Sequence, residues 1–288
     1  MSTTVATAPT ARKVTDTRTI NWGRILSYVL LVLFAIIYLG PLLMLVSTSL
    51  KTLPDFMKNA TSLPTSLNFK NFTEAWTRAN FPRYLTNTVL YTVSATVIYL
   101  VTAVFVAFPI SRGYVKGAKI LLTLFVIALF LPVALIPQFQ LMLALGLYNN
   151  PFGYVLLFLV NPIGIIILVN YIKTLPKEMD EAAAIDGCGP FQIFWRIILP
   201  LLGPALAVTT AFTFIWTWDD FFGPLIYLSD IRSYTVQLGL RTFVDSSAES
   251  DWSGLFAMSI LTLVPVFVFF LFFQRLLIEG IATTGMKR

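Results

Sequence analysis

Few residues in this sequence could carry chemistry, and their types exclude most catalytic sites. The 288 residues include no histidine and a single cysteine, Cys188. The chain therefore lacks the residues needed for histidine-based acid/base catalysis, for histidine-ligated metals and for an intramolecular disulfide. The sequence also has no glycine-rich loop that ends in Lys-Ser or Lys-Thr, the pattern of a phosphate-binding loop. By this pattern the chain does not itself hydrolyse a nucleotide.

One polar segment, residues 174–200, has residue types and spacing that predict a defined local structure. Pro176 suits the start of a helix, where a missing N–H costs little. We therefore expect a helix that begins near Leu175. Acidic residues occupy its first turns, where the helix dipole favours negative charge; they are Glu178, Asp180 and Glu181.

A second helix is expected later in the same segment. Gly187 offers the left-handed backbone that ends a helix, and Pro190 opens the next one. Apolar residues then recur at helical spacing and form a stripe; they are Phe191, Phe194, Ile197 and Ile198. Pro200 and Pro204 close this helix. Two short helices joined by a glycine turn are therefore expected between two apolar spans.

The elements that position this segment are typical of a membrane protein. Hydrophobic residues make up 57% of the chain and charged residues 12%, whereas soluble domains carry about 25% charged residues. Six apolar segments have close to the roughly 20 residues that a spanning helix needs; they are residues 25–46, 87–108, 120–135, 154–171, 204–222 and 256–276. The expected fold is an all-α polytopic membrane protein with six transmembrane helices. The third apolar run continues past Pro132 and Pro137, so a short interfacial or re-entrant helix is expected after it.

The distribution of lysine and arginine predicts the orientation. Six spans place both ends of the chain on one side, together with residues 172–203. Thirteen of the 20 Lys and Arg residues fall on that side and seven on the other. By the positive-inside rule both termini and the polar segment are cytoplasmic. On the opposite side, residues 47–86 are expected to form small helices and residues 223–255 a polar surface for a partner, with solvated loops as the alternative for both.

The polar segment resembles the signature loop of the permease subunits of bacterial ATP-binding-cassette importers. That loop reads Glu-Ala-Ala, three residues, Gly, nine residues, Ile, one residue, Leu-Pro. The positions that meet it at the same spacing are Glu181, Ala182, Ala183, Gly187, Ile197, Leu199 and Pro200, and Asp186 and Phe194 fit the longer family pattern. The departure is Cys188, where alanine is commoner.

The resemblance covers residues 25–288 and is strongest to the carbohydrate branch. It is carried by Asn87-Thr88, by the run 212–226 and by the ending 273–287, which look like the second permease of maltose-type sugar systems. It implies a MetI-like permease core in the bacterial cell membrane. The implied domains are a first transmembrane helix and extracytoplasmic loop at 25–84 and the permease domain at 85–288, which contains coupling helices at 175–200 and a cytoplasmic tail at 277–288. The resemblance does not extend to residues 1–24, whose polar composition without periodicity predicts a disordered cytoplasmic tail.

The resemblance also implies how such a chain obtains its energy. In these permeases the signature loop forms a short coupling helix that docks in a cleft of a cytoplasmic ATPase. Ala182, Ala183 and Gly187 would allow close approach, and Glu181 would pair with an ATPase arginine; the alternative for Glu181 is a solvated residue that serves only the helix dipole. The remaining candidates in this loop are Asp186, Phe194, Ile197, Leu199 and Pro200.

The C-terminus is a second implied contact with the ATPase, through Gly280, Gly285 and Lys287, with a frayed tail as the alternative. The implied partners are a homologous permease in a heterodimer, two ATPase subunits, an extracytoplasmic solute-binding protein, membrane lipid and a sugar substrate, without nucleic acid. The chain itself is expected to bind no cofactor and no metal, because ATP and Mg belong to the partner ATPase.

The fifth span provides candidates for the substrate pathway. Asp219 and Asp220 could accept hydrogen bonds from sugar hydroxyls, and Trp216 and Trp218 could offer aromatic platforms, although tryptophan also serves as an interface anchor. Asn161 in the fourth span is a weaker candidate.

The predicted function is therefore that of a transport subunit and not of an enzyme: the permease of an ATP-driven importer for a sugar or oligosaccharide, working by alternating access. A permease for another small solute, an ATP-independent carrier or channel, and a polytopic membrane enzyme are the alternatives. The signature loop disfavours the carrier, and the missing histidine with few intramembrane charges disfavours the enzyme.

Overall fold

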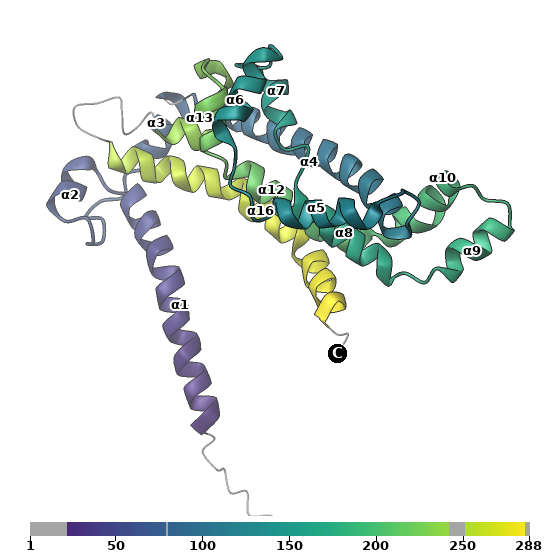
Figure 1. Cartoon of the computed structure of the whole chain (residues 1–288). Helices are drawn as coiled ribbons and strands as arrows, with labels where there is room; N and C mark the ends of the chain where they lie inside the picture. Colours follow the sequence, from purple (N-terminus) through teal and green to yellow (C-terminus); the bar gives the residue numbers. More distant parts are fainter. Residues whose placement is uncertain (1–21, 79, 242–250, 286–288) are drawn as a thin grey trace, which may run out of the picture. The chain divides into compact units, whose positions relative to one another are not determined.

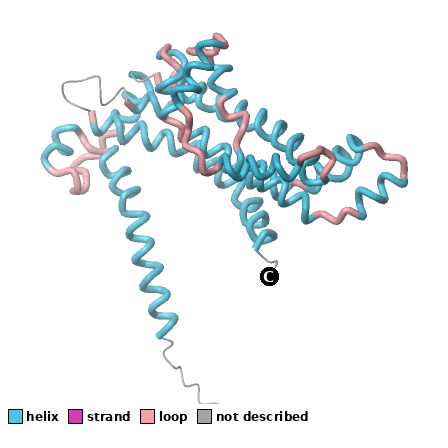
Figure 2. Tube along the Cα trace, viewed as in Figure 1, coloured by secondary structure: helices cyan, strands magenta, loops and turns pink. Residues whose placement is uncertain are grey.

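The computed structural model describes residues 22–78, 80–241 and 251–285, and within these ranges the chain is all-helical, without a strand (Figure 2). The expected all-α class is therefore confirmed. The chain divides into two units, residues 1–44 and 45–288. Nearly all of the tail predicted at residues 1–24 lies outside the described residues.

The first unit contains most of α1, which extends over Trp22–Ser49. The span expected at residues 25–46 falls inside this helix. Its sequence is apolar on all sides, and Pro41 is incorporated without ending the helix. A helix that is apolar all round suits a lipid environment.

Two small helices follow in the second unit, α2 (Leu53–Lys58) and α3 (Lys70–Arg78), as expected for residues 47–86. The loop that carries them is held by a fully buried lysine, Lys51. The Lys51 Nζ donates hydrogen bonds of 2.9 Å to the carbonyl oxygens of both Asn59 and Ala60. A buried ammonium needs such acceptors to offset its lost hydration. This connection is therefore an ordered structure and not a loosely solvated loop.

Helix α4 (Phe81–Arg112) is the central element of the second unit, and α8 (Pro162–Thr174) and α12 (Gly203–Trp218) pack against it (Figure 1). The three helices approach closely at Gly164 of α8. A Cβ at this position would collide with the Tyr99 hydroxyl of α4 and with the Thr209 methyl group of α12. Only a glycine fits this crossing, since small residues let helix backbones come together in a membrane bundle.

The fourth expected span, residues 154–171, is wrong as a continuous helix. The chain forms α7 (Pro151–Leu156), a break, and then α8, which begins at Pro162. Proline lacks the N–H needed to continue a helix and suits a helix start. The break is stabilised by hydrogen bonds: the Asn161 Oδ1 accepts from the Ile163 N–H at 3.0 Å, and the Asn161 carbonyl accepts from the Tyr99 hydroxyl at 2.6 Å.

The third apolar run also divides. Helix α5 (Ala118–Ala128) ends before the predicted boundary at residue 135, and α6 (Leu135–Ala144) follows. The residues between them, including Pro132, are not helical. A separate short helix does follow the interruption at Pro132, and it begins before Pro137.

The last spans differ from expectation mainly at their ends. Helix α12 ends at Trp218, and α13 (Phe222–Tyr227) follows after a short turn. Helix α16 extends over Trp252–Gly285, so its backbone is helical through most of residues 277–288, which the sequence assigned to a tail. By length and composition three described helices could each cross a membrane, or four if the bent pair Pro190–Leu201 and Gly203–Trp218 counts as one span.

Candidate functional site

The polar segment at 174–200 forms the helix–turn–helix predicted from its sequence. Its parts are α9 (Glu178–Ile185), α10 (Pro190–Ile193), a π-helical turn at Phe194–Ile198 and α11 (Leu199–Leu201). Gly187 has a φ of 84° and turns the chain between α9 and α10, a conformation that glycine adopts without cost. Figure 1 shows α9 and α10 at one end of the second unit, opposite α6, α7 and α13.

The prediction that the first helix begins near Leu175 is wrong by about one turn. Leu175 is extended and ends α8, with its N–H bonded to the Ile172 carbonyl oxygen. The proline ring disfavours the helical region for the residue before it, and Pro176 follows Leu175 directly. The second helix passes through the π-helical turn and ends at Leu201, between Pro200 and Pro204, as the sequence predicted. The direction changes only afterwards, by 75° between Pro190–Leu201 and α12.

A buried ion pair attaches α9 to the end of α4. The Arg112 Nε lies 2.6 Å from the Asp180 Oδ2, and both side chains are almost inaccessible to solvent. The Arg112 Nη1 also donates to the Leu175 carbonyl oxygen at 3.1 Å. One guanidinium therefore holds both the chain entering the segment and its first helix. Neither Arg112 nor Asp180 was among the sequence-predicted site residues.

Phe194 attaches the second half of the segment to the core. Its ring is buried and lies 5.3 Å from that of Phe105 and 5.2 Å from that of Phe108, both on α4. Ala183 and Ile198 belong to the same core cluster. The Ala183 side chain therefore packs inside the chain in this structure, whereas the sequence assigned it to close approach by a partner.

The opposite surface of the segment is open. Glu181, Ala182, Asp186, Gly187 and Pro200 are exposed, and Ile197 and Leu199 are half-buried. Large apolar side chains accompany them, with exposed fractions of 86% for Ile185, 65% for Phe191 and 47% for Trp195. These three residues were not singled out from the sequence as contact residues. Exposed apolar groups beside polar ones are characteristic of a surface that binds a partner.

The residues that were predicted for the substrate pathway do not form one cluster. Trp218 is 2% exposed and stacks on Phe214, whereas Trp216 is 57% exposed. Residues two apart on a helix face in nearly opposite directions, so the two tryptophans form no common platform. Asn161 caps α8 at the helix break, and Asp219 is exposed after the end of α12.

Asp220 is held in a defined position by groups that the sequence did not reveal. Its Oδ2 accepts a hydrogen bond of 2.9 Å from the Tyr154 hydroxyl, and its Oδ1 accepts one of 3.0 Å from the Gly223 N–H. The Tyr154 ring in turn packs edge-on against Tyr91 of α4 at 5.6 Å. This cluster joins α4, α7 and the turn between α12 and α13. Nothing in the local pattern around Tyr154 indicated the pairing, because its partner lies 66 residues away.

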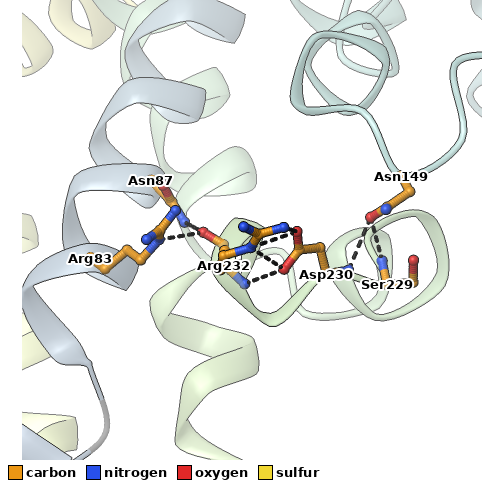
Figure 3. Close-up of polar contacts among 6 residues, drawn as sticks. All are labelled: Arg83, Asn87, Asn149, Ser229, Asp230 and Arg232. Atoms are coloured by element: carbon orange, nitrogen blue, oxygen red, sulfur yellow. Dashed lines mark hydrogen bonds and ion pairs between the residues drawn. The ribbon is translucent and has the colours of Figure 1, made fainter.

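At the same end, the connection after α13 is attached to α4 (Figure 3). The Asn87 Nδ2 donates to the Arg232 carbonyl oxygen at 2.9 Å, and the Arg83 Nε donates to that oxygen at 2.8 Å. The Arg232 side chain pairs with Asp230 at 2.8 Å, and its hydrogen bonds hold the pKa of that carboxyl below its ordinary value. The next residue of the Asn87-Thr88 motif acts similarly, since the Thr88 hydroxyl accepts from the Val236 N–H at 2.8 Å.

Comparison with known proteins assigns this architecture. Residues 79–282 match the family described as "Binding-protein-dependent transport system inner membrane component". The chain belongs to this family. The prediction of an ATP-binding-cassette importer permease is thereby confirmed, and this permease is a membrane component and not an enzyme.

Individual relatives align along nearly their whole length. The permease is 33% identical over 272 residues to the arabinooligosaccharides transport system permease protein AraQ of Halalkalibacterium halodurans, covering 91% of this chain and 97% of the relative. It is 30% identical over 277 residues to the trehalose/maltose transport system permease protein MalG of Thermococcus litoralis, covering 92% and 97%. A solved bacterial ABC transporter that imports alginate contains a chain with a TM-score of 0.80 and 26% identity, with 88% of this chain and 95% of that chain covered.

Proposed function

We propose that this permease imports a sugar or oligosaccharide and that ATP hydrolysis by partner subunits drives it. The two relatives are named for arabinooligosaccharides and for trehalose and maltose, and the structural relative for alginate. All four of these compounds are carbohydrates, which supports a substrate with many hydroxyl groups. The chain would bind no cofactor itself, since ATP and Mg would be held by the ATPase.

The proposed topology has six membrane crossings with both ends in the cytoplasm. Helices α1, α4 and α16 are long enough to cross alone, and the bent pair that ends in α12 would form another crossing. The two remaining crossings would each be made from short helices, α5 with α6 and α7 with α8. Breaks of this kind are tolerated in membranes where the bundle satisfies the freed backbone groups, and the bond from Tyr99 to the Asn161 carbonyl is such a case. Residues 25–84 would form the first helix with its external loop, and 85–288 the permease domain.

The proposal that residues 175–200 couple the permease to the ATPase rests on one observation. This segment has one side that is fixed to the core and one side that is exposed to solvent. One side is fixed to the core by the Arg112–Asp180 ion pair and by Phe194, and the other presents Glu181 and Gly187 to solvent. Such a segment suits docking of a helix into a groove of the ATPase. Because its inner side is rigidly attached, a movement of the ATPase would be transmitted to α4 as a rigid-body displacement.

The complete transporter would contain a homologous second permease, two ATPase subunits and an extracytoplasmic solute-binding protein. In this assembly the external connection around Asp230 would face the binding protein. Trp216, Asp219 and Asp220 would lie along the substrate pathway, with Trp218 and Asn161 shaping its walls. At the C-terminus, Gly280 and Gly285 of α16 would reach the ATPase, whereas Lys287 lies outside the described residues.

Reconstitution of the purified transporter in proteoliposomes tests this function. Uptake of a labelled oligosaccharide should require ATP, the ATPase subunits and the binding protein together. Omission of the ATPase should abolish uptake. Sugar uptake by this chain alone without ATP would show that the coupling proposal is wrong, and ATP-driven uptake of only non-carbohydrate solutes would refute the substrate class.

A further inference from the structure

Residues 175–200 are called the coupling segment. A groove lies beside the point where this segment is attached to α4, at a place where three elements of the permease meet. It has a volume of about 640 Å³ and is formed by the C-terminal end of α4, by α5 from Ala118 to Val126 and by the residues around the end of α8. Four basic residues line it: Arg112, Lys119, Lys173 and Lys177. No aspartate or glutamate is among the described residues that line it.

The charge in this groove is mostly uncompensated. Arg112 is neutralised by Asp180. For Lys119, Lys173 and Lys177, no ion pair is formed with any carboxylate in the part of the chain that the structure describes. Three like charges that converge on one groove repel each other. An anionic group bound between them would relieve that repulsion.

The rest of the groove is apolar, and its direction is defined by α5. Lys119, Leu122 and Val126 lie on one face of this helix and all line the groove. The rise of a helix places Val126 about 10 Å beyond Lys119 along α5. Ala118 and Ile110 add to the apolar wall. The groove is therefore basic where the helices end and apolar along the helix body, which matches an anionic head group followed by a hydrocarbon chain.

We propose that this groove binds an anionic glycerophospholipid, with the phosphate between Lys119, Lys173 and Lys177 and an acyl chain along α5. Basic pockets between transmembrane helices on the cytoplasmic side are suited to such head groups. The assignment of the groove to that side rests on the proposed topology. Lipid binding itself is measured without transport, so the two proposals fail independently.

The test titrates the purified complete transporter with lipid and counts bound molecules by native mass spectrometry. Dioleoylphosphatidylglycerol should remain bound, whereas dioleoylphosphatidylcholine, with the same chains and no net charge, should not. Free glycerol 3-phosphate distinguishes a lipid from a soluble phosphate. If it binds as tightly as the whole lipid, the acyl chain contributes nothing and the proposal is wrong.

Charge removal identifies the site. The triple variant Lys119→Gln, Lys173→Gln and Lys177→Gln should lose about fivefold in phosphatidylglycerol affinity for each charge. A matched control, Lys58→Gln, Lys70→Gln and Lys116→Gln, removes three exposed charges that do not line the groove and should bind like the original protein. Equal lipid binding by both triple variants would overturn the proposal.

Two further measurements test the position of the acyl chain and the alternative that a protein segment occupies the groove. Leu122→Trp fills the apolar part without altering charge and should weaken phosphatidylglycerol binding; undiminished binding would overturn the acyl placement. Zero-length cross-linking of the complete transporter should leave the three lysines unlinked. Cross-links from them to carboxylates of the ATPase would identify a protein occupant instead. If the triple variant does not assemble, Lys119→Gln alone should still show the fivefold loss.

Discussion

The Arg112 guanidinium on α4 and the Asp180 carboxylate on α9 form a buried ion pair, with 2.6 Å between Nε and Oδ2, across 68 residues of sequence. The same guanidinium bonds to the Leu175 carbonyl oxygen. These contacts make the end of α4 the anchor of the coupling segment. The segment therefore has one fixed side and one side available to a partner.

Loss of this ion pair should loosen the coupling segment. Asp180→Asn leaves the Arg112 charge buried without a carboxylate, which typically costs about 3–5 kcal/mol. Hydrogen exchange should speed up across residues 178–200 while α12 stays protected. Glu181→Gln is the control, because this neighbouring carboxylate is exposed. Unchanged exchange in Asp180→Asn would mean that the aromatic packing of Phe194 alone holds the segment.

A bulky residue at the turn between α9 and α10 should uncouple the ATPase. Gly187→Trp adds a large side chain on the open surface and also strains a backbone with a φ of 84°. ATPase association and ATP-driven uptake should fall sharply while membrane insertion is unaffected. Gly187→Asn separates the two effects, since asparagine tolerates the left-handed conformation and should retain more activity. Normal uptake by Gly187→Trp would contradict the docking role.

Helix packing at Gly164 predicts a stability effect far from the coupling segment. Gly164→Ala places a methyl group against the Tyr99 hydroxyl and Thr209. Overpacking of this kind costs about 1–3 kcal/mol and should lower the thermal unfolding temperature in detergent. Gly203→Ala is the matched control, because a Cβ there meets no atom within 4 Å. Equal unfolding temperatures for the two variants would show that α8 shifts without cost.

The substrate pathway is best tested with exposed residues. Trp216→Ala and Asp219→Asn should raise the KM for the transported sugar without altering ATPase association, because neither side chain supports the core. Trp218→Ala is expected to act differently. Its ring is 2% exposed, and removing a buried tryptophan costs about 3–5 kcal/mol in stability. Unchanged uptake kinetics in Trp216→Ala and Asp219→Asn would reassign these residues to membrane-interface anchoring.

The ion pair between Asp230 and Arg232 predicts that the stability of the protein depends on pH. Arg232 holds the pKa of Asp230 below its ordinary value, so the carboxylate stabilises the connection fully above the ordinary aspartate pKa of about 4. This contribution is lost as the pH falls through the lower folded-state pKa. Asp230→Asn should therefore unfold at a lower temperature than the original protein at pH 7, and the difference should close on acidification. If the two unfolding temperatures still differ at low pH, the negative charge of Asp230 is not the cause of the difference.

Much of this protein was determined by its sequence alone. Composition and apolar runs predicted a helical membrane protein, and the prolines, glycines and apolar stripe of residues 174–200 predicted the helix–turn–helix. The resemblance of Glu181 to Pro200 to a signature loop indicated the permease family, which the family match confirms. These properties depend on residues close together in the chain, since proline, glycine and helical periodicity act over a few positions. The same local rules account for the break before α8, at Pro162, and for the start of α9 after Pro176.

The tertiary structure alone decided which distant residues meet. Asp180 was one of three acidic residues at a helix start, and only the packing of α9 against α4 selected it for Arg112. Tyr154 became the partner of Asp220, and Ala183 turned inward, for the same reason. The lysines of the groove come from separate elements that converge only when the helices pack. Such pairings depend on distances in space between residues far apart in the sequence, and no local pattern encodes them.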